Sequence, residues 1–161
     1  ALVAARAPAG ACALAPGPRP GALVSAGLGV TPTVSMVLGL GGAGDRRPVV
    51  FVHVARDGRH HPLADEVRRE IERANSASLH VFYSRPRAQD AIGREFDHAG
   101  RPEPGQLLDL VAEATGGTGE RTDVDVYLCG PVPFMAAMQE GLEAQGVASE
   151  RIHGERFGPR G

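Results

Sequence analysis

One short run, Val49 to Ala55 (VVFVHVA), constrains the fold of this chain more than any other feature. Strands with both faces buried have near-continuous apolar sequences, because helices cover both sides of an all-parallel sheet. The run therefore predicts a strand inside a parallel sheet. Parallel neighbours are joined by long crossovers, usually helical, so the rest of the chain must supply further strands and the helices between them.

Strand-like and helix-like segments do alternate along the chain. Short apolar runs stand at 22–26, 79–84 and 124–129, and a further strand is expected in the tail at 152–157. Apolar residues recur at helical spacing within 34–38, 63–73, 107–111 and 134–142. This alternation predicts an α/β fold, a Rossmann-like doubly wound sheet of about five parallel strands with helices on both faces.

The overall properties of the chain limit its partners. Its 161 residues suit one domain, expected to run from 22 to 161 after a Pro- and Gly-rich lead-in over 1–21. A net charge of -2 without a basic cluster argues against nucleic acid. No apolar stretch approaches the roughly 18 residues that span a membrane. With only two cysteines and no targeting signal, we expect a cytoplasmic protein, and the start at Ala1 suggests a longer polypeptide.

Ligands of doubly wound sheets bind just beyond the carboxyl ends of the strands, so the segments following each strand are the candidate sites. After the first strand, a Gly-rich turn leads into a helix and contains Gly27, Gly29, Thr31 and Pro32. Free backbone N–H groups at such a turn can hold a diphosphate. The turn lacks the third glycine of the G-x-G-x-x-G fingerprint, and no acidic residue stands about 20 positions on. A plain strand-to-helix turn explains the segment about as well.

Polar and aromatic side chains follow the third and fourth strands. Ser84 and Arg85 suit an adenosine ribose or its 2′-phosphate, although a solvated charge beside a turn is the simpler interpretation. After the fourth strand, Gly130 leaves room for a planar ring, and Cys129 places a polarizable sulfur at the strand tip. Phe134, one turn into the following helix, is a further candidate for cofactor binding, although Cys129 and Phe134 could equally be core residues.

The C-terminal segment and the histidines give weaker indications of a binding site. Glu155 and Phe157 follow the last predicted strand, where an aromatic could cover a flat cofactor or fix the terminus. His53, His60 and His61 match no compact metal-ligand spacing, so no metal site is expected.

Five segments in the same order resemble a known family. They are SAGLGVTP at 25–32, HVARDG at 53–58, FYSRP at 82–86, YLCGPVPFM at 127–135 and ERFGP at 155–159. Together they resemble the NAD(P)-binding domain of the ferredoxin–NADP reductase superfamily, and their spacing is most similar to the C-terminal domain of flavohaemoglobins. RAPAGAC at 6–12 resembles the end of the FAD-binding barrel that precedes this domain in the superfamily.

The resemblance assigns roles to the residues already singled out. The residues implied to face the cofactor diphosphate are Gly27, Gly29, Thr31 and Pro32, with Ser84 and Arg85 at the adenosine ribose and Cys129, Gly130 and Pro131 at the nicotinamide. Phe157 would cover one face of the flavin, and Glu155 would lie near the site of hydride transfer, which makes Glu155 and Cys129 the implied catalytic residues. Gly154 departs from the family pattern, in which an aromatic residue precedes the glutamate.

The implied function is delivery of hydride from NAD(P)H to an FAD bound mostly by an upstream domain. In flavohaemoglobins the electrons then reach a haem that converts nitric oxide and oxygen to nitrate, so the resemblance leaves open an upstream haem (globin) domain as a further partner. By itself the NAD(P)-binding domain is expected to be inactive. Two alternatives stay open: the reductase component of an oxygenase system, and a non-catalytic module that senses a dinucleotide.

Overall fold

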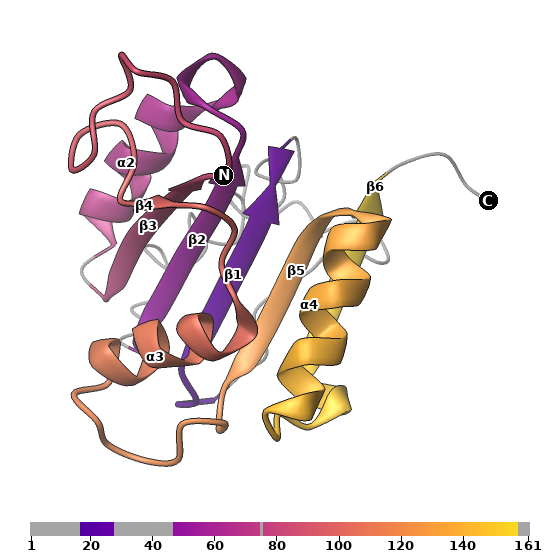
Figure 1. Cartoon of the computed structure of the whole chain (residues 1–161). Coiled ribbons are helices and arrows are strands. Elements are labelled where there is room, and N and C mark those ends of the chain that lie inside the picture. The colour runs from indigo at the N-terminus through magenta and orange to yellow at the C-terminus, as the bar shows by residue number, and fades with distance from the viewer. Residues whose placement is uncertain (1–16, 28–46, 75, 158–161) are drawn as a thin grey trace, which may run out of the picture.

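A computed structural model describes residues 17–27, 47–74 and 76–157, the last three of these by their backbone alone. Within these ranges a single parallel sheet has six strands: β1 (Gly21–Ala26), β2 (Val49–Ala55), β3 (Ala77–Tyr83), β4 (His98–Ala99), β5 (Asp125–Pro131) and β6 (Ile152–Phe157). Their order is β4-β3-β2-β1-β5-β6 (Figure 1). The α/β class and the parallel sheet predicted from the sequence are confirmed.

Helices cover both faces of the sheet. They are α2 (Ala64–Arg73), α3 (Pro104–Ala114) and α4 (Val132–Ala144), with the short 3₁₀ helices η3 (Gly58–His60) and η4 (Ser149–Arg151). Helix α2 lies on one face, and α3 and α4 lie together on the other (Figure 1). The helix expected around 34–38 falls outside the described residues.

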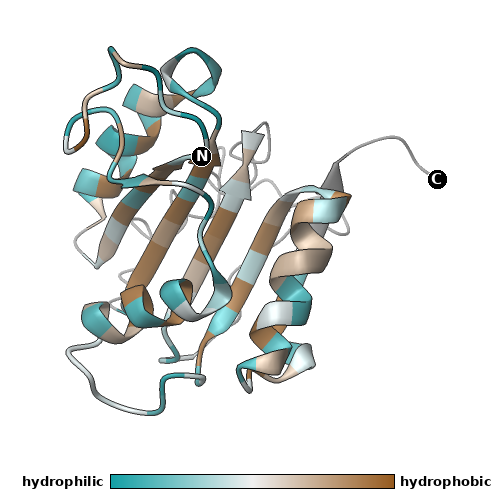
Figure 2. Ribbon diagram, viewed as in Figure 1, coloured by the Kyte–Doolittle hydropathy of each residue, from teal (hydrophilic) through white to brown (hydrophobic). Residues whose placement is uncertain are grey.

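Side-chain alternation along the strands builds the two halves of the core. Leu23, Phe51 and Tyr127 point to the α2 face and cluster with Val67 and Ile71 of that helix. The intervening strand residues point the other way, onto α3 and α4. All seven residues of β2 are buried, as its apolar run predicts. Figure 2 shows the same division, with hydrophobic strands inside and hydrophilic outer helix surfaces.

The sheet differs from the sequence-based prediction in two places. β4 is a sixth strand, between β3 and α3, where the sequence analysis predicts no strand. His98 stacks on Phe82 with ring centroids 4.4 Å apart, and the Gly100 N–H donates to the Tyr83 carbonyl at 2.8 Å. In addition, β5 does not end at Cys129: Gly130 and Pro131 continue the strand and pair with residues 156 and 157 of β6.

The described part of the lead-in is attached to the sheet. Arg19 forms an ion pair of 2.8 Å with Asp123, and Asp123 also accepts from Arg151 at 2.6 Å. The Asp125 N–H donates to the Pro20 carbonyl at 3.1 Å, which joins the lead-in to the start of β5. Within the part of the chain that the structure describes, no helix is both long and apolar enough to cross a membrane.

Candidate nucleotide-binding site

The strand order places a switch point between β1 and β5. The chain runs outward from β1 through β2, β3 and β4 on one side, then returns to the other side for β5 and β6. In open α/β sheets the crevice at such a point, outside the carboxyl ends of the strands, is where ligands bind. Gly27 directly follows β1, and Gly130 lies near the end of β5, so both predicted glycines lie at the switch point.

Gly27 leaves its backbone open at the switch point. Its φ of +58° lies in the left-handed region, which side chains disfavour. It is exposed, and a Cβ built on it would meet nothing within 4 Å. A ligand can therefore approach the peptide groups here. Gly29, Thr31 and Pro32, predicted to complete this turn, lie outside the described residues.

Gly130 lets the ends of β1 and β5 come close together. A Cβ on this buried glycine would lie 3.2 Å from the Ala26 Cβ and 3.3 Å from a ring carbon of Phe134. Phe134 is half-buried and packs against the core, so the core interpretation describes at least part of its role. Pro131 is exposed beside them.

Cys129 lies deeper than the sequence suggested. Cys129 is 2% exposed and lies two positions before the end of β5. It is in register with Ser25 of β1 and Glu155 of β6. The prediction that its sulfur occupies the strand tip is wrong, because β5 continues through Gly130 and Pro131.

The backbone of β6 brings the predicted tail residues to the same edge of the sheet. Glu155 pairs with Cys129, and Phe157 pairs with Pro131. At Gly154, where the family pattern has an aromatic residue, a Cβ would collide with the Cε of Met135 on α4. The end of this methionine side chain occupies the space and would have to move to admit a larger residue.

Ser84 and Arg85 extend the pairing of β2 and β3 beyond the ends of both strands. The Ser84 N–H donates to the Ala55 carbonyl at 2.9 Å, and the Arg85 N–H donates to the Arg56 carbonyl at 2.8 Å. Ser84 is half-buried, whereas Arg56 and Arg85 are both exposed. Residues 56, 84 and 85 thus lie beyond the ends of β2 and β3, at the same edge of the sheet as the switch point.

An acidic residue does follow β2, but its carboxylate serves the local turn. Asp57 caps η3 and accepts from the N–H groups of Arg59 and His60 at 2.9 and 3.2 Å and from the His60 ring at 2.8 Å. Burial opposes its ionisation, yet the hydrogen bonds from His60 and the two amides outweigh burial and lower the pKa of Asp57. This carboxylate is therefore not directed toward a ribose.

A network of polar side chains behind the strand ends is not predicted by the local sequence pattern. The Ser25 hydroxyl hydrogen-bonds His53 Nδ1 at 2.7 Å, the ring of His53 stacks on His61 at 5.1 Å, and His61 Nδ1 bonds the Tyr83 hydroxyl at 2.7 Å. Burial lowers the pKa of His53 to about 3 and that of His61 to about 4, so both rings are neutral at pH 7. This network thereby joins the carboxyl ends of β1, β2 and β3.

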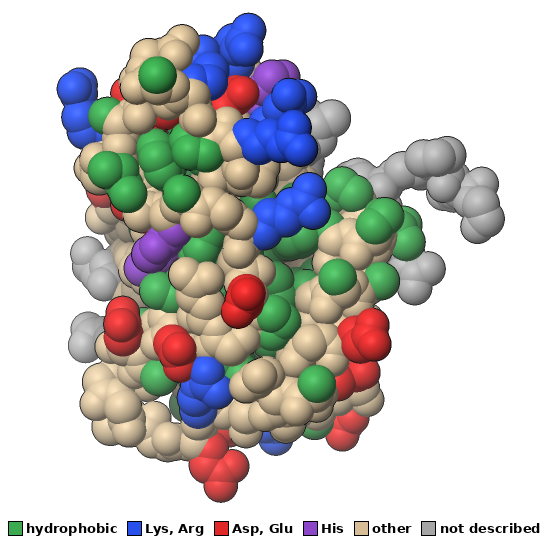
Figure 3. All heavy atoms as spheres, in the orientation of Figure 1, with side chains coloured by type: hydrophobic (Ala, Val, Ile, Leu, Met, Phe, Trp, Pro, Cys, Tyr) green, Lys and Arg blue, Asp and Glu red, His purple; other side chains and the backbone are tan. Residues whose placement is uncertain are grey.

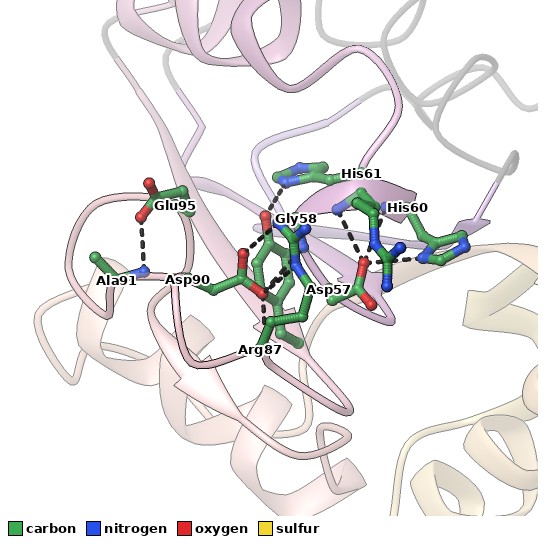
Figure 4. A network of polar contacts seen from close by, with 10 residues as sticks. Asp57, Gly58, His60, His61, Arg87, Asp90, Ala91 and Glu95 are labelled. Carbon is green, nitrogen blue, oxygen red and sulfur yellow. Dashed lines mark hydrogen bonds and ion pairs between the residues drawn. The ribbon is translucent and has the colours of Figure 1, made fainter.

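These contacts give the histidines roles other than metal binding. His60 and His61 bond Asp57 and Tyr83 respectively (Figure 4). Among residues 17–27, 47–74 and 76–157, no group of three or more His, Cys, Asp or Glu side chains is placed to hold a metal ion.

Known proteins are similar to this chain in sequence and in fold. The chain is 42% identical over 139 residues to a flavohemoprotein of Chromobacterium violaceum, covering 86% of this chain and 32% of that protein. A flavohem-like FAD/NAD binding domain of nitric oxide dioxygenase from Vibrio cholerae superposes with a TM-score of 0.70 at 28% identity, over 91% of this chain and 54% of that one.

A crystal structure of flavohemoglobin from Malassezia yamatoensis with bound FAD and heme matches with a TM-score of 0.68 at 25% identity, over 87% of this chain and 32% of that one. The chain spans about a third of the length of the curated relatives it matches. These relatives confirm the resemblance found in the sequence. Residues 23–140 match the family described as the oxidoreductase NAD-binding domain, and the chain belongs to that family.

Proposed function

We propose that this chain binds NAD(P)H and orients it for hydride transfer to an FAD held largely by another domain of a flavohaemoglobin-like reductase. The observation that carries the proposal is the meeting of Gly27 and Gly130 at the switch point between β1 and β5, with Ser84 and Arg85 along the same edge. The similarity to flavohemoproteins supports it.

The residues at this edge fit a dinucleotide. Gly27 offers open backbone for a diphosphate, because nothing lies within 4 Å of the position that its Cβ would occupy. Ser84 and Arg85 supply a hydroxyl and a guanidinium for the adenosine ribose. Gly130 lets Ala26 and Phe134 pack closely against it, and so brings the ends of β1 and β5 together beside the proposed nicotinamide position.

When bound, NAD(P)H supplies a hydride and FAD accepts it, so the protein's contribution is binding and orientation. Pro131 and Phe134 border the nicotinamide position and exclude water from it. Cys129 and Glu155, which pair on the neighbouring strands β5 and β6, are the proposed catalytic residues. Phe157, at the end of β6, would cover the flavin.

The proposal extends to the activity of the whole protein, by analogy with its relatives. The Malassezia flavohemoglobin holds both FAD and heme, and the Vibrio domain comes from a nitric oxide dioxygenase. By analogy, an FAD-binding domain would receive the hydride from this one, and a haem domain would use the electrons to convert nitric oxide.

A matched pair of glycine variants tests the proposed site. Gly27 and Gly117 are both exposed, both have positive φ (+58° and +78°), and neither has an atom within 4 Å of its built Cβ. Gly117 lies in the loop between α3 and β5, at the opposite end of the sheet. Each change to alanine costs roughly 1–2 kcal/mol of backbone strain.

Titration of the chain with NADH and NADPH should show binding to the wild type. Gly27→Ala should weaken it about tenfold or more, or at least ~1.4 kcal/mol, because the new methyl group meets the diphosphate. Gly117→Ala should bind like the wild type. Failure of the wild type to bind either nucleotide, or equal losses in both variants, would refute the proposed function.

A further inference from the structure

Four side chains near the proposed nucleotide site form one connected group, here called the histidine network: Ser25, His53, His61 and Tyr83. Ser25, His53 and Tyr83 come from the neighbouring strands β1, β2 and β3, and His61 comes from the segment between η3 and α2. The three strand residues are at most 1% exposed. Ser25 lies two positions before Gly27, and Tyr83 is the last residue of β3. The network is therefore buried at the ends of strands that border the proposed site.

The contacts within the network involve uncharged groups. The Ser25 hydroxyl bonds His53 Nδ1 at 2.7 Å, and the Tyr83 hydroxyl bonds His61 Nδ1 at 2.7 Å. Between these two bonds the rings of His53 and His61 stack, with centroids 5.1 Å apart and an interplanar angle of 21°. Burial lowers the pKa of His53 to about 3 and that of His61 to about 4, and it raises the pKa of Tyr83 to about 12. A series of neutral contacts thus connects the end of β1 to the end of β3.

The surroundings of the two rings disfavour a positive charge. Within the described residues, the His53 ring contacts a hydroxyl and another imidazole, and its Nε2 is buried without a hydrogen-bond partner. Of the charged groups on α2, Arg68 lowers the pKa of His61 and Asp65 raises it by less. The sequence from 28 to 44 contains no acidic, basic or histidine residue. Two protonated rings stacked in this way would repel each other, because like charges at short range in a poorly solvated site interact strongly.

The network also lies toward the more basic end of the molecule. Figure 3 shows most basic side chains of the visible face toward the end where the strands point, and most acidic ones toward the other end. Arg56 and Arg85 follow β2 and β3 and are exposed. Asp57 and Asp90, the carboxylates of these two turns, accept hydrogen bonds from backbone N–H groups of the turns, and neither bonds a ring of the network. A proton added to the network therefore gains no carboxylate partner there.

The segment that carries His61 is held in an unfavourable conformation. Leu63 precedes α2 with a φ of +58° and a ψ of +23°, and among the described residues it alone, apart from glycines, has a positive φ. A branched side chain in the left-handed region persists where surrounding contacts hold the backbone there. Two such contacts are the bond of His61 to Tyr83 and its stack on His53. Loss of these contacts would let the segment relax, which gives the network a second state.

We propose that His53 and His61 are positioning residues for the nucleotide site and make its affinity sensitive to acid. With both rings neutral, the network holds the ends of β1, β2 and β3 together, and the site keeps its binding shape. With the rings protonated, the network opens and the site loses affinity while the sheet stays folded. This inference rests on the proposed function and adds regulation by pH to that site.

Acid weakens the closed network and does not strengthen it. In the open state each ring takes up a proton near its ordinary pKa of about 6.5, whereas in the closed state the pKa stays at about 3 for His53 and about 4 for His61. The closed state is therefore fully favoured above about pH 6.5 and loses up to about tenfold per ring for each pH unit below it. Between about pH 7 and about pH 5.5, the two rings together can shift the balance by at most roughly 70-fold.

Calorimetric titration of the chain with freshly dissolved NADH at about pH 7 and about pH 5.5 measures this dependence. NADH is the suitable probe because its diphosphate stays ionised over the interval, whereas a phosphate monoester such as that of NADPH titrates within it. The double variant His53→Gln/His61→Gln keeps an amide for each hydroxyl and has no proton to gain. His153→Gln is the matched control, because this histidine stacks on Tyr127 near the amino end of β6, at the opposite end of the sheet. Circular dichroism at both pH values establishes whether each protein is folded.

The wild type should bind NADH at least about fivefold more weakly at about pH 5.5 than at about pH 7, with the circular dichroism of a folded sheet at both. In the double variant the difference should fall below about twofold, and the control should keep the wild-type difference. Binding at the lower pH should also release protons from the wild type, no more than about two per nucleotide. The dependence of the binding heat on the ionisation enthalpy of the buffer measures this release, which should be smaller in the double variant.

An affinity that does not change with pH, or an equal change in the wild type and the double variant, would overturn the role of the two histidines and leave the proposed function intact. The same holds if NADH binding is lost only together with the folded circular dichroism, because acid unfolding would then account for it. If the double variant does not fold, His61→Gln alone decides the matter, and it should reduce the wild-type difference to about its square root. A wild type that binds no NADH at about pH 7 would overturn both the inference and the proposed function.

Discussion

Two arginines on the same turn, Arg85 and Arg87, differ in their environment. Arg87 is paired with the buried Asp90, which raises the pKa of its guanidinium and commits it to the fold. Arg85, two positions earlier, is exposed, and its backbone rather than its side chain secures it to β2. Of these two arginines, Arg85 is the one whose side chain can change partners without disturbing the turn.

Arg85→Ala should therefore act selectively on NADPH. A charge-assisted contact contributes roughly 1.5–3 kcal/mol, so the Kd for NADPH should rise about 10- to 100-fold while that for NADH changes little. Arg69→Ala, which removes an exposed arginine from α2, provides the control. Equal losses for the two nucleotides, or none for either, would remove Arg85 from the site.

His53 makes a prediction about acid stability. Its pKa is lowered to about 3 by burial and by the charge of His61, against about 6.5 in the unfolded chain. A group whose pKa is depressed in the folded state binds protons preferentially when unfolded. Its stabilising contribution is therefore present above about pH 6.5 and is lost as the pH falls toward 3, by roughly 3–5 kcal/mol in total.

Urea unfolding of the wild type at pH 7.0 and 4.5 measures this loss as a fall in the free energy of unfolding. His53→Gln keeps a hydrogen-bonding group for Ser25 but has no proton to gain, so its stability should depend less on pH over the same interval. An identical pH dependence in variant and wild type would show that His53 is not the responsible group.

At the scale of residues, the sequence predicts which residues lie next to the end of a strand. It does not predict which side chains contact one another across neighbouring strands. Gly27, Ser84, Arg85 and Gly130 could be identified because each follows, or ends, an apolar run. The bonds of Ser25 to His53 and of His61 to Tyr83 join positions 28 and 22 residues apart. Nothing in local periodicity indicates them, since they depend on the register of β1, β2 and β3.

At the scale of elements, α3 and α4 are brought together by a glycine within a helix. Gly141 lies in the interior of α4, and a Cβ there would collide with the ring of Pro104, the first residue of α3. Glycine inside a helix costs about 1 kcal/mol relative to alanine, so a close helix contact is the compensation.

Gly141→Ala should therefore destabilise the protein, despite the better helix propensity of alanine. Overpacking costs ~1–3 kcal/mol, which equals or exceeds the gain in propensity. Gly105→Ala in α3 is the comparison, because its Cβ would make an ordinary 3.5 Å contact with Arg121, so this change should be neutral or stabilising. Thermal melts that rank the two variants in the opposite order would contradict this account of the helix contact.

Elements with a strong hydrophobic pattern could be predicted, and those fixed by tertiary contacts could not. The run in β2 and the spacing of Val67 and Ile71 in α2 each determine their element locally. β4 has two residues, too few for any period, and exists because His98 packs on Phe82. The extension of β5 through Pro131 likewise depends on its pairing with β6.

At the scale of the whole molecule, the proposed function assigns this chain one side of a reaction. The proposed dinucleotide site lies at the switch point of its sheet, and the chain spans about a third of the length of its flavohemoprotein relatives. Hydride transfer needs an acceptor ring held against the nicotinamide. In the proposed function that ring is bound mainly by a different domain.

The 161-residue chain by itself should therefore be colourless and should reduce no dye when NADH or NADPH is added. It should still bind the nucleotide, because Gly27, Gly130 and Arg85 all lie within it. Visible absorbance of the purified chain, before and after incubation with FAD and removal of unbound flavin, measures the first expectation, and a dye-reduction assay measures the second. A chain that retains stoichiometric yellow FAD would contain a flavin site of its own, and the division of labour between two domains would then be wrong. Nucleotide binding without colour and without dye reduction is the result that separates an orienting domain from a complete reductase.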